Sequence, residues 1–267
     1  MEYLILGILI VIVTYLGLLR YINDMRISSL HIKNLHNKTK DRTNILFIYP
    51  HPDDEVMNSA GLIARTVASS SFKVYAISTT HGEHGDEFLK VSPKELAEVR
   101  KKEYANVMHF LKVSDWEMWD YIDGNMQEQE QELQKQLSDF VAKNKIDLLV
   151  TYEKYGLYGH PDHISLSKST NIIAKQMGLP VLYATLPDKI LKRIDLPKTL
   201  TYKDKIVALS LDKIANPTLR LNVFRSLLLK YQVTKLYKSQ SVSRGKLKRL
   251  LRWLFMPYEY YTTQHDS

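Results

Sequence analysis

The chain has 267 residues, enough for a short terminal element and one domain of ordinary size. Apolar residues make up 45% and charged residues 25%, a balance that excludes a disordered chain and is typical of a globular protein. The sequence contains no cysteine, so disulfides are excluded and any transition-metal site must use His, Asp or Glu.

The formal net charge of +8 is concentrated near the C-terminus. Eleven Lys or Arg and no acid lie between Lys213 and Tyr258, whereas the rest of the chain is close to balance. This basic C-terminal region (213–258) suits anionic lipid headgroups or nucleic acid, and it is also compatible with an ordinary solvated face.

The N-terminus begins with an uncharged apolar run from Tyr3 to Leu19. As an α-helix this run spans roughly 25 Å, and Tyr21 and Ile22 bring it near the thickness of a bilayer. A cleaved signal peptide is the alternative, but no basic residue precedes the run and no small-x-small site follows it. The sequence therefore predicts an uncleaved transmembrane anchor over residues 1–22.

The residues after this run set the expected orientation. Six Lys or Arg and two Asp lie between Arg20 and Arg42. The positive-inside rule then places the rest of the chain in the cytoplasm. Residues 23–43 are predicted to be a basic polar tether, and the folded domain is predicted to begin at residue 44.

Strands and helices are predicted to alternate along this domain. The expected elements are a strand at 44–49, a helix at 56–67, a strand at 73–79, a helix from the Ser92–Pro93 capping box to Leu111, a strand at 116–119, a helix around 133–141, and strands at 147–152 and 180–185. This order predicts an α/β fold, a Rossmann-like and mostly parallel sheet flanked by helices. There is no GxGxxG motif, so no dinucleotide site is indicated.

Two segments near the C-terminus have helical spacing. Phe224, Leu227, Leu228 and Tyr231 are expected to face the core. Residues 246–256 combine a leucine stripe with Lys and Arg, which is typical of a basic amphipathic helix on an anionic membrane. A core-packed helix with a basic outer face is the alternative for 246–256.

Three polar clusters each follow a predicted strand: HPDDE at 51–55, THGEHG at 80–85 and YGHPDH at 158–163. Ligands of open α/β sheets bind beyond the carboxyl ends of the strands, so the clusters are expected to converge on one site. His51 and Asp54, with either His160 or His163, would form a His–His–carboxylate metal face. Asp53 would then lie beside a water at the metal and act as general base. The alternative is that the acids only cap a helix, which does not explain the histidines.

These motifs resemble the PIG-L/LmbE family of zinc-dependent N-acetylglucosaminyl deacetylases. The resemblance rests on PHPDDE, the GExG loop, the pair Arg100 and Glu103, and GHPDH, and it covers residues 44 to about 165. A weaker similarity follows at Lys230 and at Tyr237-x-Ser239-Gln240.

The resemblance implies a role for each matching residue. His51, Asp54 and His163 would be the zinc ligands, with iron or cobalt also suited to such ligands. Asp53 would be the general base, and His160 the cation or acid that stabilises the oxyanion and protonates the leaving amine. Asp162 would orient His160, and Tyr158 would hydrogen-bond the oxyanion.

Two further residues are candidates for substrate binding. Arg100 would contact a sugar hydroxyl or a phosphate, or else pair with Glu103. Asp123 would contact sugar hydroxyls, or else belong to an ordinary Asp-Gly turn. Neither His81 nor His84 is expected to bind zinc.

Together these features predict a membrane-anchored enzyme that removes the acetyl group from an N-acetylglucosamine-containing glycolipid. The alternatives are a tethered deacetylase or amidase of a soluble sugar conjugate, and a non-catalytic membrane scaffold that binds glycolipid or a partner protein. Nucleic-acid binding through residues 213–258 is less favoured, because an anchored domain has a simpler use for positive charge.

Overall fold

The structure is a computed structural model of the chain. It describes residues 1–23, 25–85, 89–192, 199–202, 205–208, 213–241, 257–263 and 265. The predicted amphipathic helix at 246–256 lies outside the described residues, as does part of the basic C-terminal region.

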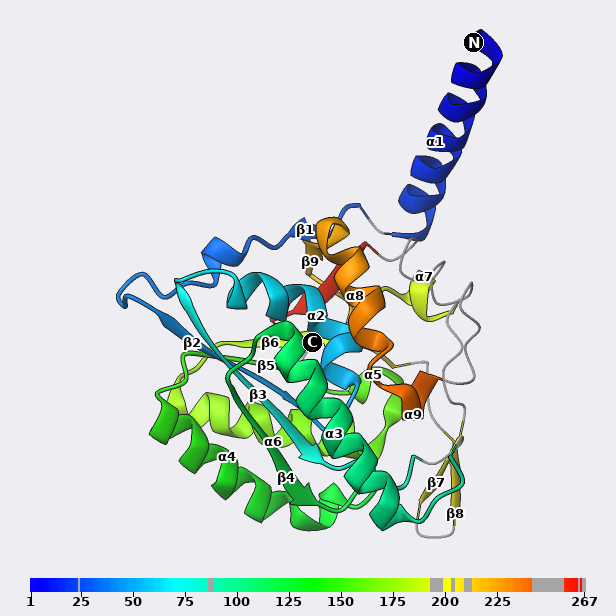
Figure 1. The fold of residues 1–267 in the computed structure, drawn as a ribbon. Coiled ribbons are helices and arrows are strands. Elements are labelled where there is room, and N and C mark those ends of the chain that lie inside the picture. Colours follow the sequence, from blue (N-terminus) through cyan, green and yellow to red (C-terminus); the bar gives the residue numbers. More distant parts are fainter. Residues whose placement is uncertain are drawn as a thin grey trace.

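The N-terminal helix α1 (Glu2–Ile22) projects away from the rest of the molecule (Figure 1). Its Tyr3–Ile22 segment has a mean hydropathy of 2.3 and is only 6% buried, so its length and composition would allow it to cross a membrane. Residues 25–43, predicted to be a tether, are attached to the domain through β1 (Ser28–Ser29) and the buried Leu30. A 3-10 helix, η1 (Ile32–Asn34), follows.

The first half of the domain alternates strands and helices; all the predicted elements are present, and the helices between residues 152 and 180 are additional to the prediction. Its elements are β2 (Thr43–Tyr49), α2 (Asp54–Val67), β3 (Phe72–Thr80), α3 (Pro93–Leu111), β4 (Asp115–Tyr121), η2 (Met126–Gln129), α4 (Glu130–Asn144), β5 (Leu148–Tyr152), α5 (Gly156–Gly159), α6 (Pro161–Met177) and β6 (Val181–Thr185). The capping box at Ser92 and Glu95 is formed at the start of α3.

The second half is less regular. Its described elements are α7 (Asp188–Leu191), β7 (Thr199–Tyr202), β8 (Lys205–Ala208), β9 (Leu219–Asn222), η3 (Phe224–Ser226), α8 (Leu227–Thr234), α9 (Lys238–Ser241) and β10 (Tyr258–Thr262). Strands β7 and β8 pair with each other in a separate hairpin.

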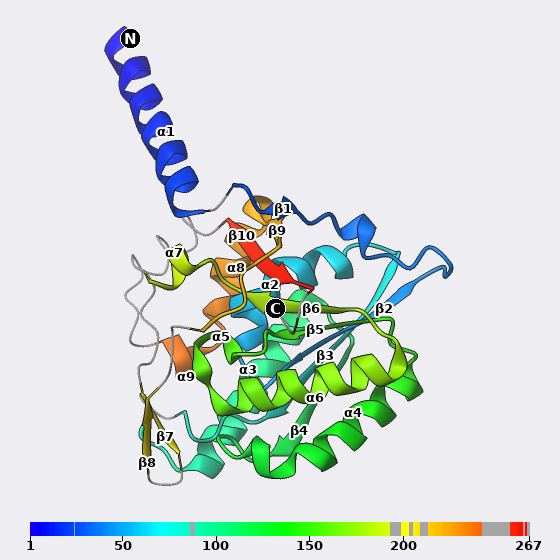
Figure 2. The same ribbon diagram turned by 180° about the vertical axis from the view of Figure 1, so that it is seen from behind.

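Eight strands form the main sheet in the order β1-β9-β10-β6-β5-β2-β3-β4. The five strands from β6 to β4 run parallel, whereas β10 is antiparallel to both β6 and β9. Helices α2, α3 and α8 cover one face and α4 and α6 the other (Figures 1 and 2). The predicted fold class, a mostly parallel α/β sheet flanked by helices, is confirmed.

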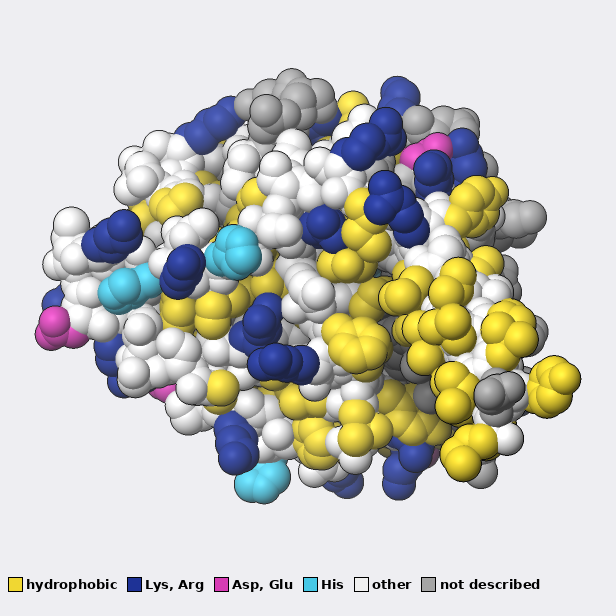
Figure 3. Space-filling view, turned by 90° about the horizontal axis from the view of Figure 1, so that it is seen from above, with side chains coloured by type: hydrophobic (Ala, Val, Ile, Leu, Met, Phe, Trp, Pro, Cys, Tyr) yellow, Lys and Arg dark blue, Asp and Glu magenta, His cyan; other side chains and the backbone are white. Residues whose placement is uncertain are grey.

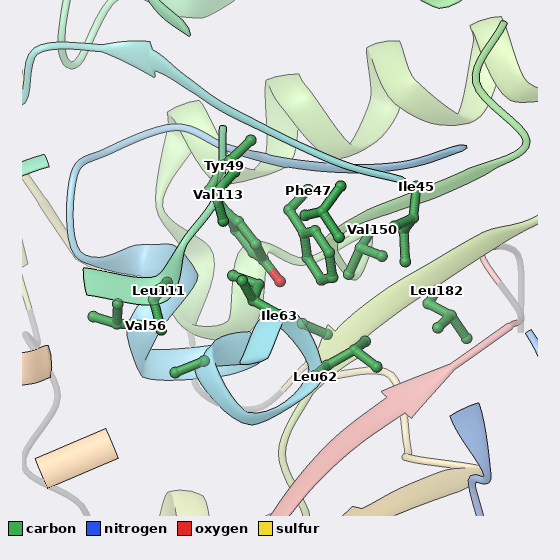
Figure 4. Packing of buried hydrophobic residues seen from close by; sticks show 14 of the residues in the cluster. Ile45, Phe47, Tyr49, Val56, Leu62, Ile63, Leu111, Val113, Val150 and Leu182 are labelled. Carbon is green, nitrogen blue, oxygen red and sulfur yellow. The ribbon is translucent and has the colours of Figure 1, made fainter. Parts of the chain in front are cut away.

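Strand β2 is buried on both faces, which explains its continuous apolar sequence. Ile45, Phe47 and Tyr49 pack with α2 residues in the cluster that Figure 4 shows. Leu46 and Ile48 point the other way, into the cluster that α4 and α6 cover. The central strand is thereby held rigidly, and so is the segment that directly follows it.

Candidate active site

The predicted polar clusters meet at the point in the sheet where the strand order reverses direction. The chain passes from β2 to β3 and β4 on one side, and later places β5 and β6 on the other side of β2. Open α/β sheets bind ligands beyond the carboxyl ends of the strands at such a point. His51 and Asp54 follow β2, whereas His160 and His163 follow β5, and all four are buried there.

Three donor atoms of this cluster have the spacing of metal ligands. His51 Nδ1 lies 3.3 Å from Asp54 Oδ2 and 3.3 Å from His163 Nε2. The distance from His163 Nε2 to the same Asp54 oxygen is 3.5 Å. Ligands bound at 2.0–2.1 Å to a tetrahedral zinc ion lie about 3.3 Å apart. His160 also offers a ring nitrogen within 4.8 Å of nitrogens of the other two histidines.

The turn between β2 and α2 gives the two neighbouring acids different environments. Asp53 has a left-handed backbone, with φ at 109°, and α2 begins at Asp54. The backbone N–H of His51 donates to Asp54 Oδ2 at 3.0 Å. Asp53 occupies the N-cap position, but its side chain makes no capping hydrogen bond. Helix capping therefore does not account for Asp53.

The tautomer of the neutral His163 ring leaves Nε2 available as a metal ligand. Its Nδ1–H donates to the carbonyl oxygen of Gly156 at 3.1 Å, so Nε2 of the neutral ring carries the lone pair. Burial lowers the pKa of His163 to about 4, which keeps the ring neutral near pH 7. Gly156 has φ at +64°, and a Cβ there would lie 2.7 Å from His163 Cβ, so only glycine permits this contact.

Tyr152, at the carboxyl end of β5, holds two members of the cluster. Its hydroxyl donates to Asp54 Oδ1 at 2.6 Å, and its ring stacks on His163 with centroids 4.1 Å apart. Burial opposes ionisation of Asp54, but His163, His51 and this hydrogen bond lower the pKa of the carboxyl well below its usual value. Tyr152 was not among the residues predicted from the sequence, and its place at the end of a strand was the only available signal.

Asp123 and Asp162 contact the far side of His51. Asp123 Oδ1 lies 3.0 Å and Asp162 Oδ2 3.1 Å from His51 Nε2. Burial opposes a charged ring, yet the three nearby acids, Asp123 first, raise the pKa of His51 well above its usual value. The surroundings thus favour positive charge at this point, which a divalent cation would also supply.

The structure places these two acids differently from the sequence predictions. Asp123, predicted to contact sugar hydroxyls, also accepts from the backbone N–H of His84 at 2.9 Å. Asp162, predicted to orient His160, uses its carboxylate to accept from the backbone N–H groups of Gly124 and Met126 at 2.6 and 3.1 Å. The physical reason is that the 123–126 turn folds over α6 and supplies donors closer than His160.

His160 is oriented by the backbone at the start of α6. Its Nδ1 accepts from the N–H of Asp162 at 3.2 Å, so the proton of the neutral ring lies on Nε2. Burial, together with His163 and His51, lowers the pKa of His160 to about 3. These surroundings favour a neutral hydrogen-bond donor over the predicted cation or acid. Tyr158 packs edge-on against His160 and His163, with centroids 6.0 and 5.1 Å away.

Arg100 supports the loop after β3 rather than pairing with Glu103. Its Nη2 donates to the carbonyl oxygen of Gly85 at 3.2 Å, and a Cβ at Gly82 would lie 1.9 Å from its Nη1. Glu103 instead accepts from the N–H and hydroxyl of Ser239 at 2.9 and 2.6 Å. Nearby, His81 contacts Asp120, and His84 Nδ1 donates to the Asp123 carbonyl oxygen.

Residues 230–240, the segment with the weaker similarity, contact the HPDDE cluster at 51–55. Tyr237 donates a hydrogen bond to Glu55 Oε1, and Glu55 Oε2 accepts from the backbone N–H of Asp53 at 3.1 Å. Burial raises the pKa of Glu55 to about 8, with a further contribution from the Asp53 charge. The left-handed Asp53 is thereby connected to the C-terminal part of the domain, a connection that the sequence did not predict.

The PIG-L family, described as GlcNAc-PI de-N-acetylase, matches residues 46–174, which contain all nine predicted site residues. Residues 46–174 form a PIG-L family domain. The match begins in β2 and ends in α6, so the PIG-L domain contains both halves of the His–Asp cluster.

Two relatives of this PIG-L domain have assigned names. A 1D-myo-inositol 2-acetamido-2-deoxy-alpha-D-glucopyranoside deacetylase of Kineococcus radiotolerans is 29% identical over 47% of this chain and 43% of its own length. A probable N-acetylglucosaminyl-phosphatidylinositol de-N-acetylase of Schizosaccharomyces pombe is 27% identical over 49% of this chain and 52% of its own. The chain thus spans about half the length of these relatives.

A solved structure shares the fold of the PIG-L domain over a longer range. The N,N'-diacetylchitobiose deacetylase of Pyrococcus horikoshii matches with a TM-score of 0.64, covering 86% of this chain and 87% of its own at 20% identity. At this identity the likeness shows the fold alone.

Proposed function

We propose that this chain is a metal-dependent hydrolase that removes the acetyl group from an N-acetylglucosamine unit carried on a lipid. The observation that supports this most directly is the spacing of His51 Nδ1, Asp54 Oδ2 and His163 Nε2, at 3.3 to 3.5 Å from one another. The PIG-L domain supports the same reaction class.

His51, Asp54 and His163 would hold the metal ion. The neutral His163 and the ionised Asp54 have the protonation states that ligands require. His51, whose pKa is raised by the neighbouring acids, would release its Nδ1 proton when the metal binds. A bound divalent ion would polarise the amide carbonyl and lower the pKa of a water molecule. Zinc fits two histidines and a carboxylate, and iron or cobalt would fit the same ligands.

Asp53 would act as general base on the attacking water. It adjoins the ligand Asp54, and its backbone N–H is held by Glu55. The carboxylate would take one proton as the water oxygen bonds to the carbonyl carbon. Because His160 is neutral, the proton taken by Asp53 would pass to the leaving nitrogen when the C–N bond breaks. The products are the free amine and acetic acid, which releases the second proton of the water to become acetate.

His160 and Tyr158 would stabilise the negative charge on the carbonyl oxygen. His160 Nε2–H is the free donor of a ring whose Nδ1 is already occupied, and Tyr158 packs against that ring. Burial keeps the Tyr158 pKa well above its usual value, so the hydroxyl stays a donor. Preorganised donors of this kind each contribute about 10²–10³ to the rate. Asp162 and Asp123 would orient His51, and Arg100 would hold the substrate-facing loop 82–85.

A lipid-linked substrate is supported by α1. A single membrane span would tether the domain to the surface where such a lipid resides, and the basic flank of α1 would place the domain in the cytoplasm. The name of the S. pombe relative, a de-N-acetylase of a phosphatidylinositol sugar, agrees with this. A soluble sugar–inositol conjugate is the second candidate, because the name of the Kineococcus relative describes one.

Acetate release by the full chain in lipid vesicles tests the proposal. The substrates are an N-acetylglucosaminyl phospholipid in the same vesicles and a soluble N-acetylglucosaminyl inositol. We expect release from the lipid that a chelator abolishes and zinc restores. Asp53→Asn should keep the metal yet lose about 10²–10⁴ in rate. The control variant Asp120→Asn, at an exposed position of β4, should keep the rate unchanged.

Each outcome separates the candidate functions. Faster release from the soluble conjugate would replace the lipid substrate by the second candidate. A protein that binds one metal ion and releases acetate from neither substrate would overturn the hydrolase and favour a non-catalytic scaffold. Activity that survives complete removal of the metal would overturn the role of His51, Asp54 and His163.

A further inference from the structure

The residues that follow α1 are attached directly to strands β9 and β10 of the main sheet. Tyr260 donates to the side chain of Asn23 at 2.8 Å, and Asn23 is 1% exposed. Arg220 Nε donates to the carbonyl oxygen of Ile27 at 2.8 Å. Asn23 directly follows the apolar segment Tyr3–Ile22, so no residue separates that segment from this buried contact with the domain.

This attachment determines how far the domain can stand from a membrane. A helix of 20 residues is about 30 Å long, the thickness of the hydrocarbon core, so α1 has no length to spare. If α1 spans the bilayer, Asn23 lies at the boundary of the hydrocarbon. The headgroup layer then extends over the domain surface around β9 and β10.

Exposed hydrophobic side chains lie on this surface. Phe224 is 54% and Leu228 68% exposed, although their helical spacing predicted a place in the core. The prediction is wrong for these two side chains because the opposite side of the segment faces the core, where Lys230 Nζ contacts Glu259 Oε1 at 2.6 Å. With Lys230 on the buried side, Phe224 and Leu228 face outward.

A chain of contacts connects this hydrophobic pair to the base of α1. The N–H of Phe224 donates to Asn222 Oδ1 at 2.9 Å, and Asn222 pairs with Tyr258 across β9 and β10. The hydroxyl of Tyr258 contacts Met25 Sδ at 3.6 Å. Phe224 therefore lies at the end of the molecule from which α1 rises, where Figure 1 places the start of α8.

The charge of this end suits an anionic surface. Arg20, Arg26 and Arg225 are exposed here. Figure 3 looks onto this end and shows many Lys and Arg side chains around the hydrophobic groups, with few Asp or Glu. Basic residues beside exposed aromatic and leucine side chains are typical of proteins that lie in the headgroup layer.

We propose that Phe224 and Leu228 insert into the headgroup region of the anionic leaflet that α1 crosses, and that Arg225 binds lipid phosphate there. This membrane-docking face (Phe224, Arg225, Leu228) rests on the membrane anchor of the proposed function. It holds the domain on the bilayer in one orientation instead of letting it swing on a flexible tether.

Site-specific labels on the full chain test this proposal, because the absence of cysteine allows single-cysteine variants without background. A nitrobenzoxadiazole label is attached to each of three variants: Leu228→Cys, Gln131→Cys and Ile12→Cys. Each labelled protein is then placed in vesicles of phosphatidylcholine and phosphatidylglycerol. Gln131 is the control, exposed on α4 at the far end of the molecule from α1 (Figure 2). We expect blue-shifted emission and loss of iodide quenching at Ile12 and Leu228, with full quenching at Gln131.

The labels distinguish the failure of this proposal from the failure of the anchor. A lipid-buried label at Ile12 with a quenched label at Leu228 would overturn the docking face and leave the anchor intact. A quenched label at Ile12 would overturn both. Protection of the Leu228 label from iodide that increases with the protein-to-lipid ratio would show that a second copy of the chain covers this face. That result would overturn the lipid contact.

Discussion

The hydroxyl of Tyr152 donates to Asp54 Oδ1 at 2.6 Å, on the carboxylate whose other oxygen faces His51 and His163. The Tyr152 ring also stacks on His163 with only 6° between the planes. One side chain from β5 thereby orients two of the three proposed ligands. Loss of a group that orients metal ligands in this way typically lowers metal affinity by about 10- to 100-fold.

Tyr152→Phe should therefore weaken metal binding while leaving the fold intact. The change removes one hydrogen bond to Asp54 but keeps the stacked ring, and we expect metal affinity to fall about 10-fold or more. Competition with a chromophoric chelator measures it. Tyr49→Phe is the matched control, because Tyr49 packs 5.1 Å from Tyr152 but hydrogen-bonds Ser59. Equal affinities for the two variants would contradict the role of Tyr152.

Asp123→Asn separates metal binding from sugar binding. Because Asp123 contacts His51 Nε2 at 3.0 Å, the amide should reduce metal affinity by about 10-fold or more and leave KM of the metal-saturated enzyme unchanged. If Asp123 contacted the sugar, KM would rise and metal affinity would not change. Asp120→Asn, three residues earlier and 95% exposed, controls for the loss of one negative charge.

The sheet and the location of the site could be predicted because both depend on short-range patterns. The apolar run 44–49 predicted a buried strand, and β2 occupies Thr43–Tyr49. The Ser92 capping box predicted the start of α3 to the residue. Polar residues directly after buried strands predicted one shared site, and the clusters after β2 and β5 meet there with three donor atoms within 3.5 Å.

The groups behind the site could not be predicted, because they reach it through contacts between distant parts of the chain. Tyr237 lies 182 residues from Glu55, and Asp123 lies 72 residues from His51. No local spacing encodes such pairs. The segment 224–231 shows the same limit: the apolar spacing predicted Phe224 and Leu228 inward, whereas the structure buries Lys230 against Glu259 and exposes these two side chains.

Glu55→Gln should change how stability depends on pH. Burial raises the pKa of Glu55 from 4.5 to about 8, so between these values the folded state holds a proton that the unfolded state releases. The free energy of unfolding therefore falls as pH rises from about 4.5 to about 8, and Glu55 contributes no further change above that. Glutamine does not titrate, so the variant should lose less stability over this range.

Denaturant unfolding of the metal-free chain in detergent, at several pH values, measures this difference. The difference between the unfolding free energies of the two proteins at each pH isolates the effect of Glu55, because all other titrating groups are common to both. Parallel curves for the two proteins would show that Glu55 is ionised in the folded state and would contradict the raised pKa.

Lys230→Met should be among the most destabilising single changes in the domain. The Lys230 and Glu259 side chains are 2% and 1% exposed, and Glu259 also accepts from the N–H groups of Gly61 and Leu62. Removal of one partner leaves a buried charge, which typically costs about 3–5 kcal/mol. The double variant Lys230→Met/Glu259→Gln should recover part of this loss, and the exposed Lys238→Met should change stability by less than about 0.5 kcal/mol. Denaturant unfolding measures all three, and a Lys230→Met variant as stable as Lys238→Met would contradict the buried ion pair.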